Sequence, residues 1–175
     1  DARIDGLRVS LSILALIAFE HDWNWPVAEA GLQRVVASQP GFSRGHLRYS
    51  GFLTAMRRFD EAQEEARLAK ELDPLSAIAG QTLGIRFYYG GRCDLAAPEF
   101  RKALELEPSS FVARLGLGQC AWRQGRVREA LPSFEQAFAD SQGSTYALGW
   151  LGFAYAQAGD AERAREVLGR LTKPA

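Results

Sequence analysis

The sequence predicts an all-α protein built from about five antiparallel helix pairs that repeat along the chain. The first observation is an alanine that recurs every 34 residues, at Ala28, Ala62, Ala96, Ala130 and Ala164. Further series keep the same step, namely Pro40, Pro74 and Pro108; Ser50, Gly84, Gly118 and Gly152; and Ala69, Ala103 and Ala137. The second observation is that apolar residues inside each unit lie at helical spacing. Coinciding series at one period indicate repeated supersecondary units that stack on their neighbours.

The unit over residues 77–110 shows how the first helix of a pair arises. Apolar and small residues lie at helical spacing along one face of this helix, namely Leu83, Gly84 and Phe87. The pair Gly90-Gly91 then breaks the helix, because glycine is a poor helix former. Small residues on this face are expected where two helices cross closely.

The second helix of the same unit begins near Asp94, which is expected to cap it. Its buried stripe is Ala96, Phe100 and Ala103. Glu107 precedes Pro108, and a residue before proline is steered out of the helical region, so the helix ends there.

Neighbouring units repeat this design in order along the chain. Residues 59–62 open one second helix, and residues 129–137 form another with the same alanine and phenylalanine spacing. Pro98 and Pro132 are expected near the first turn of their helices, where a missing N–H matters least.

A family resemblance follows from the type unit, through Leu83, Gly84, Phe87, Gly91, Ala96, Phe100, Ala103 and Pro108. These residues resemble the tetratricopeptide repeat (TPR) pattern almost in full, and the period of the chain is specific to that family. The resemblance covers about residues 9–171. It implies a right-handed superhelical solenoid whose first helices line a concave groove. The first pair departs most, since Leu16 replaces the small residue and Trp23 stands where the turn glycine is usual.

The expected domain organisation is simple. One TPR-like solenoid domain spans residues 9–171, with a C-terminal tail over residues 172–175. The chain opens on Asp1, so residues 1–8 are expected to be a flank that continues from a missing upstream segment.

Composition narrows the classes of function. Lys and Arg together number 21, as do Asp and Glu, so no net charge favours nucleic acid or an anionic membrane. No apolar run reaches the roughly 20 residues that a membrane span needs. Two cysteines, Cys93 and Cys120, are too few for a disulfide framework and indicate a cytoplasmic protein with reduced thiols.

Three sequence features that could indicate a catalytic, cofactor-binding or metal-binding site are better explained by the helical repeat or lack the residues that such a site needs. Residues 41–45 match the G-x-S-x-G nucleophile elbow, but a helix precedes Ser43, which begins the next helix instead. Residues 116–121 match a loose dinucleotide fingerprint inside an expected helix. His21 and His46 lack an acidic cluster at metal spacing. We therefore expect no enzyme, no catalytic residue, no metal site and no cofactor.

The TPR resemblance implies that one stripe on each first helix faces the groove. The candidate peptide-binding residues on or beside this stripe are Arg44, Gln81, Ile85, Tyr88, Tyr89, Gln119, Trp122, Arg123, Tyr146 and Phe153. Aromatic side chains with few charges suit an apolar peptide or a partner helix. The alternative is that Tyr88 and Trp122 only pack between adjacent repeats.

The first helix, expected from residue 9 to Phe19, is apolar nearly all round. A helix of this kind is covered on more than one side. We therefore expect Leu11, Leu14 and Phe19 to contact either an upstream helix or a second copy of the chain, as in a homodimer.

These features predict a non-catalytic scaffold that binds proteins or peptides through a concave, aromatic-lined groove. The alternative is a regulatory or dimerisation segment of a larger bacterial signalling or transcription protein. It rests on residues 21–29 and 72–76, which are similar to repeat regions of bacterial multidomain regulators with winged-helix or adenylate-cyclase domains.

Overall fold

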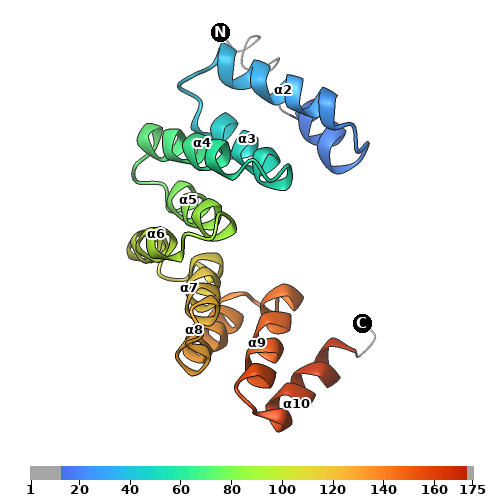
Figure 1. Cartoon of the computed structure of the whole chain (residues 1–175), viewed down its shortest axis with the longest axis vertical. Coiled ribbons are helices and arrows are strands. Elements are labelled where there is room, and N and C mark those ends of the chain that lie inside the picture. The colour runs from blue at the N-terminus through green and yellow to red at the C-terminus, as the bar shows by residue number, and fades with distance from the viewer. Residues whose placement is uncertain (1–12, 173–175) are drawn as a thin grey trace. The chain divides into compact units, whose positions relative to one another are not determined.

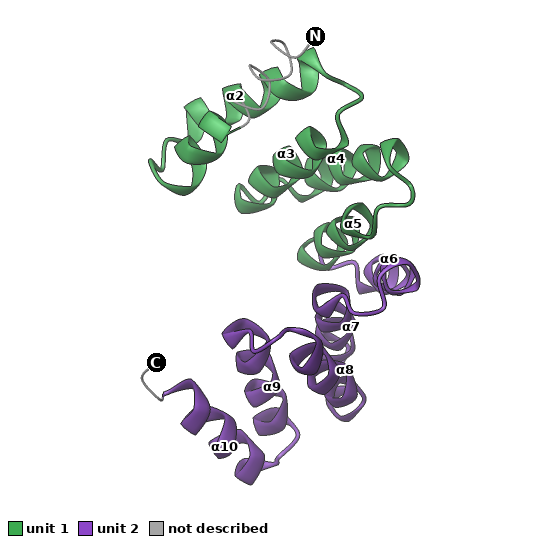
Figure 2. Cartoon of the chain, turned by 180° about the vertical axis from the view of Figure 1, so that it is seen from behind, with its two compact units in different colours: residues 1–90 green, residues 91–175 purple. Residues whose placement is uncertain are grey.

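The computed structural model describes residues 13–172, which form helices joined by short turns and contain no strand (Figure 1). The chain divides into two compact units, residues 1–90 and residues 91–175 (Figure 2). Unit 1 holds a helical segment at residues 13–20 and the helices α2 (Trp25–Ser38), α3 (Ser43–Ala55), α4 (Phe59–Leu72) and α5 (Ala77–Tyr89). Unit 2 holds α6 (Cys93–Leu106), α7 (Phe111–Arg123), α8 (Val127–Asp140), α9 (Thr145–Gln157) and α10 (Ala161–Leu171).

Consecutive helices pack against one another within each unit, as the 34-residue period predicts. The all-α repeat fold is thereby confirmed. The boundary between the units falls in the Gly90-Gly91 turn, and the single domain expected over residues 9–171 stays a prediction.

Serine side chains start three of the helices at the same place in the repeat. The Oγ atoms of Ser76, Ser110 and Ser144 each accept a hydrogen bond from the backbone N–H three residues later. This is the usual N-cap arrangement, which satisfies a donor that the helix itself leaves free. The caps therefore fix the beginning of α5, α7 and α9.

A left-handed residue ends each first helix. Gly91, Gly125 and Gly159 have φ angles of 80°, 78° and 83° in the turns after α5, α7 and α9. Trp23 and Arg57 occupy the equivalent positions of the first two repeats, with φ angles of 54° and 61°. Trp23 thus stands where the turn glycine is usual, as expected from the sequence, and its backbone still adopts the left-handed conformation.

The alanine series lies in the core. Ala28, Ala62, Ala96 and Ala130 have no exposed surface, and Ala164 is partly buried against the core of unit 2. In unit 1 the core residues are Ala15, Ala18, Ala28, Leu32, Tyr49, Phe52, Leu53 and Ala62. In unit 2 they are Leu115, Ala130, Phe134, Ala137, Leu148, Leu151, Ala154, Tyr155 and Val167. Alanine at this step lets neighbouring helices approach closely.

Two local expectations are wrong. Asp94 does not cap α6, which begins at Cys93 after Arg92. Its carboxylate lies in the first turn, where the helix dipole still favours a negative charge. Pro98 and Pro132 lie inside α6 and α8 instead of in the first turn. Each therefore leaves one carbonyl of the preceding turn without its helical partner.

Candidate functional site

An aromatic cluster on unit 2 contains several of the predicted groove residues. Trp122 of α7 meets two rings of α9 edge to face, with centroid distances of 5.9 Å to Trp150 and 5.2 Å to Phe153. Trp150 and Phe153 are themselves 5.7 Å apart at an interplanar angle of 86°. We call Trp122, Trp150 and Phe153 the aromatic cluster. Edge-to-face pairs of this kind hold large rings in fixed orientations.

Phe134 of α8 packs against the aromatic cluster from the core of unit 2. This ring is fully buried and stacks on Trp150 with a centroid distance of 5.9 Å and an interplanar angle of 7°. Trp150 was not among the predicted groove residues, because it lies beside the stripe and not on it. Its spacing of four residues from Tyr146 was the signal that could have placed both rings on one side of α9.

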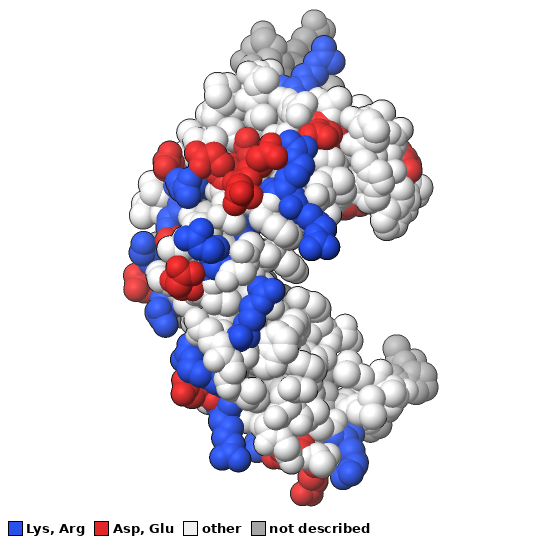
Figure 3. Space-filling model, viewed as in Figure 1, with Lys and Arg blue, Asp and Glu red and all other residues white. Residues whose placement is uncertain are grey.

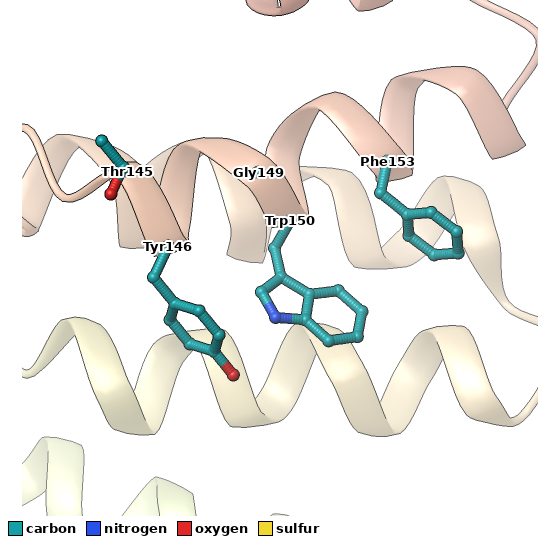
Figure 4. Close-up of a pocket in the computed structure, with 5 residues that line it drawn as sticks. All are labelled: Thr145, Tyr146, Gly149, Trp150 and Phe153. Atoms are coloured by element: carbon teal, nitrogen blue, oxygen red, sulfur yellow. The ribbon is translucent and has the colours of Figure 1, made fainter. Parts of the chain in front are cut away.

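A pocket of about 400 Å³ lies beside the cluster and is lined by Thr145, Tyr146, Gly149, Trp150 and Phe153. Figure 4 shows Tyr146, Trp150 and Phe153 projecting from the same side of α9. The side chain of Tyr146 is 56% exposed and that of Phe153 is 37% exposed. Gly149 leaves open space in this wall, because nothing lies within 4 Å of the place a methyl group would take. The pocket is therefore apolar and accessible.

The other predicted groove residues of unit 2 are less accessible to a ligand or lie away from the pocket. Gln119 is only 8% exposed, so its amide lies mostly within the packing of α7. Trp122 is partly buried, whereas Arg123 next to it is exposed. The residues that can contact a ligand most directly on this unit are therefore Tyr146 and Phe153.

The predicted residues of unit 1 lie on α3 and α5. Gln81, Ile85 and Tyr88 are partly buried, and Tyr89 is 49% exposed. The rings of Tyr88 and Tyr89 meet edge to face with a centroid distance of 5.5 Å. Arg44 is exposed near the beginning of α3. Tyr88 and Tyr89 therefore form a smaller aromatic pair on unit 1.

Charged side chains of both signs are interspersed on the face seen in Figure 3. Several pair along one helix, such as Arg126 with Glu129 at 2.8 Å. Arg58 contacts both Glu61 and Glu29, and hydrogen bonding to Glu61 and Glu29 raises the pKa of Arg58. Exposed pairs of this kind contribute little to stability and give no electrostatic signature for a ligand.

The motifs with catalytic resemblance have structural roles. Ser43 begins α3 after helix α2, with no strand before it, and its Oγ donates a hydrogen bond to the carbonyl of Ala69 at 2.9 Å. Residues 116–121 lie within α7. Both interpretations made from the sequence are confirmed, because neither motif joins a strand to a helix.

His46 is held between two oxygen atoms in unit 1. Its Nδ1 lies 2.6 Å from a carboxylate oxygen of Glu65, and its Nε2 lies 3.0 Å from the carbonyl oxygen of Pro40. His21 pairs with Asp22 at the surface. Within residues 13–172 no group of three His, Cys, Asp or Glu side chains could hold a metal ion.

The described part of the first helix exposes apolar side chains. Leu14 is 61% exposed, and Ile13 and Ile17 are both close to half exposed. Phe19 instead packs inside unit 1, with its ring 5.7 Å from Trp25 and 5.4 Å from Phe52. Leu11, the remaining predicted contact residue, lies outside the described residues.

Sequence models of known families match the second half of the chain. One model described as a tetratricopeptide repeat matches residues 82–144, and another of the same description matches residues 121–175. No curated protein matches the sequence. No helix within residues 13–172 is long and apolar enough to cross a membrane.

Solved structures share the fold at low sequence identity. A thermophilic TPR protein of Thermus thermophilus has a TM-score of 0.82 at 14% identity, covering 94% of this chain and 89% of that one. PilF of Pseudomonas aeruginosa has a TM-score of 0.80 at 16% identity, with 98% and 79% covered. YrrB, described as a TPR protein with an unusual peptide-binding site, has a TM-score of 0.62 at 20% identity, with 92% and 82% covered.

Proposed function

The chain belongs to the tetratricopeptide repeat family, and from this premise we propose that it is a non-catalytic scaffold that binds an apolar peptide or helical segment of another protein. The observation that carries the proposal is the aromatic cluster on unit 2 with its adjoining pocket. A cytoplasmic location, expected from the sequence, belongs to the same proposal.

The pocket has the chemistry of a peptide anchor site. Exposed aromatic side chains bury a large area when a partner covers them, and they lose few rotamers in doing so. Tyr146 and Phe153 are exposed, while Trp122 and Trp150 hold the wall behind them. A leucine or phenylalanine of a partner can enter the pocket beside Gly149 without displacing protein atoms. The likeness to YrrB, a TPR protein with an unusual peptide-binding site, supports the same class of ligand.

The residues predicted from the stripe on unit 1 remain in the proposal as a second contact surface. These are Arg44, Gln81, Ile85, Tyr88 and Tyr89. Tyr89 is the most exposed ring among them. The proposal also includes three residues of unit 2 that lie on α7, namely Gln119, Trp122 and Arg123.

The experiment selects short randomised peptides on the immobilised protein and measures their affinity for purified variants. Phe153→Ala and Tyr146→Ala should weaken the selected peptides by about tenfold or more each, since anchor residues at binding surfaces contribute about 2 kcal/mol. Leu106→Ala is the matched control, because Leu106 is 47% exposed on α6 and does not line the pocket. The double change Tyr88→Ala and Trp122→Ala tests the anchors predicted first from the sequence.

Thermal melting of each variant keeps binding separate from folding. Tyr146 is exposed, so its truncation should leave the melting temperature close to that of the wild type. Unchanged affinity in both Phe153→Ala and Tyr146→Ala would show that the pocket is not the binding site.

A second candidate function is self-association as a regulatory or dimerisation segment of a larger protein. It is favoured by the apolar side chains exposed on residues 13–17, which a second copy of the chain would cover. Sedimentation equilibrium should show a dimer that Leu14→Glu dissociates. A wild-type protein that stays monomeric across the concentration range would contradict this function.

A further inference from the structure

Arg86 is an exception to the repeat. The residues at the equivalent positions of the other repeats are Ala18, Phe52, Cys120 and Ala154, and all four are buried and uncharged. A guanidinium group therefore stands at a position that is filled by core residues elsewhere in the chain. Such a substitution places a cation in partly desolvated surroundings, and this is unfavourable unless the charge finds a partner.

Ser50, the residue that contacts Arg86, is an exception as well. The equivalent positions of the other repeats are Leu16, Gly84, Gly118 and Gly152, and none of these carries a hydroxyl. Arg86 Nε donates a hydrogen bond to Ser50 Oγ at 3.1 Å. Two departures from the repeat, on α3 and α5 of unit 1, are thus joined to each other. If Arg86 only filled space between the helices, it would not need a hydroxyl at position 50 of the neighbouring repeat.

The hydroxyl of Ser50 is oriented to accept a hydrogen bond from Arg86, because its own hydrogen is already donated elsewhere. Ser50 Oγ gives its own hydrogen to the carbonyl of Leu47 at 2.7 Å, which leaves its lone pairs to Arg86. Ser50 is fully buried, so this contact holds the Nε edge of the guanidinium in place. Beside it, Gly51 presents no side chain, and a methyl group there would lie 3.6 Å from Arg86 Nη2. The terminal nitrogen atoms are therefore oriented by the fold and not crowded by α3.

The charge of Arg86 has no counterion in the part of the chain that the structure describes. No Asp or Glu side chain among those residues forms an ion pair with it, and its hydrogen-bond acceptor there is a neutral hydroxyl. Burial lowers the pKa of Arg86 to about 10, and the electrostatic interaction with neighbouring Tyr89 offsets only part of this desolvation. The side chain is nevertheless only partly buried, so a ligand can reach it. A planar guanidinium binds a carboxylate through two parallel hydrogen bonds.

We propose that Arg86, oriented by Ser50, is a carboxylate-binding residue on unit 1 and that its ligand is an Asp or Glu side chain in a peptide segment that lies on this unit. The inference rests on the proposed function, because it names the charged residue that the second contact surface, on unit 1, recognises. The exposed ring of Tyr89, three residues further along α5, lies on the same side of the helix for contact with that segment.

The test uses the peptide selection with a change in one residue of the protein. Short randomised peptides are displayed as N-terminal fusions, so that they carry no C-terminal carboxylate of their own. Peptides selected on the wild type should carry Asp or Glu at one fixed position beside apolar residues. A synthetic amidated peptide should lose at least about tenfold in affinity when this acid becomes an amide, as expected for a charge-assisted hydrogen bond.

Arg86→Leu should abolish the difference between the acid and amide peptides. Because leucine resembles the residues at the equivalent positions, this variant should melt at the same temperature as the wild type or higher. Arg67→Leu is the control, since Arg67 is exposed on α4 and pairs with Glu64. It should keep the full preference for the acid. Ser50→Gly introduces the residue found in the three following repeats and should weaken the preference without removing it.

The outcomes separate the two proposals. Selected peptides that lack an acid at a fixed position overturn the role of Arg86 and leave the scaffold function standing. A preference for the acid that persists in Arg86→Leu also overturns it. Failure of the wild type to select any peptide overturns both.

Discussion

Gly116→Ala tests a close contact between neighbouring repeats in unit 2. A methyl group at position 116 would lie 2.4 Å from Phe100 Cζ and less than 3 Å from two further ring carbons. Phe100 has no exposed surface, so its ring cannot move aside into solvent. The strain must therefore be taken up by α6 and α7, which pack against each other here.

The size of the effect follows from two opposing contributions. Overpacking a core of this kind costs about 2–3 kcal/mol when several atoms overlap. Alanine is favoured over glycine inside a helix by about 1 kcal/mol, which offsets part of this. The free energy of unfolding should therefore fall by about 1–2 kcal/mol, and the melting temperature by several degrees, at about 2–4 °C per kcal/mol for a chain of this size.

Gly149→Ala is the matched control, because Gly149 lies inside α9 with nothing within 4 Å of the added methyl group. It should gain up to about 1 kcal/mol from helix propensity alone. Urea denaturation followed by circular dichroism measures both variants. If Gly116→Ala is as stable as Gly149→Ala, the reasoning from the Phe100 contact is refuted.

Three further predictions concern single side chains. His46→Leu should lower the free energy of unfolding by about 2 kcal/mol, because it leaves the Glu65 carboxylate without its donor; an unchanged urea midpoint would contradict this. Arg57→Gly should raise stability by about 0.5–1 kcal/mol, since a left-handed φ of 61° is unfavourable for arginine and suits glycine; thermal melting decides the sign. Burial raises the pKa of the Cys120 thiol to about 12 from 9.0, so the unfolded thiol loses its proton first and stability should decline from about pH 9 to pH 12. Cys120→Ala should remove that part of the decline in pH-dependent urea denaturation, and a wild-type slope in the variant would count against a buried thiol.

The repeat made the fold predictable from sequence. Alanine at each step has almost no surface left in four of the five repeats, because two helices meet there. The turn after each first helix was predictable wherever glycine occupies it, as at Gly91. Helix starts were less predictable. Asp94 looked like a cap, yet the chain enters α6 earlier, since the turn is closed by backbone hydrogen bonds to Arg92 and not by the carboxylate.

The candidate site was predictable only where a residue depends on its own helix. Tyr146 and Phe153, which the TPR resemblance implied for the groove, are exposed on α9, and their role in binding stays a prediction. Gln119 has the same place on α7 as Phe153 on α9, but it is buried by packing that no single-helix pattern describes. Trp150 was missed for the same reason, because its importance depends on stacking with Phe134 of the preceding helix.

Phe100 and Phe134 occupy the same position in successive repeats, and each packs on the equivalent residue of the following helix. That residue is Gly116 in one repeat and Trp150 in the next. The helices that carry them, α7 and α9, are both 13 residues long. The same position of the repeat can thus hold either a glycine or a tryptophan while the helices around it keep their arrangement. A duplicated array of this kind can acquire a new recognition surface by point substitution in one copy while the other copies maintain the fold.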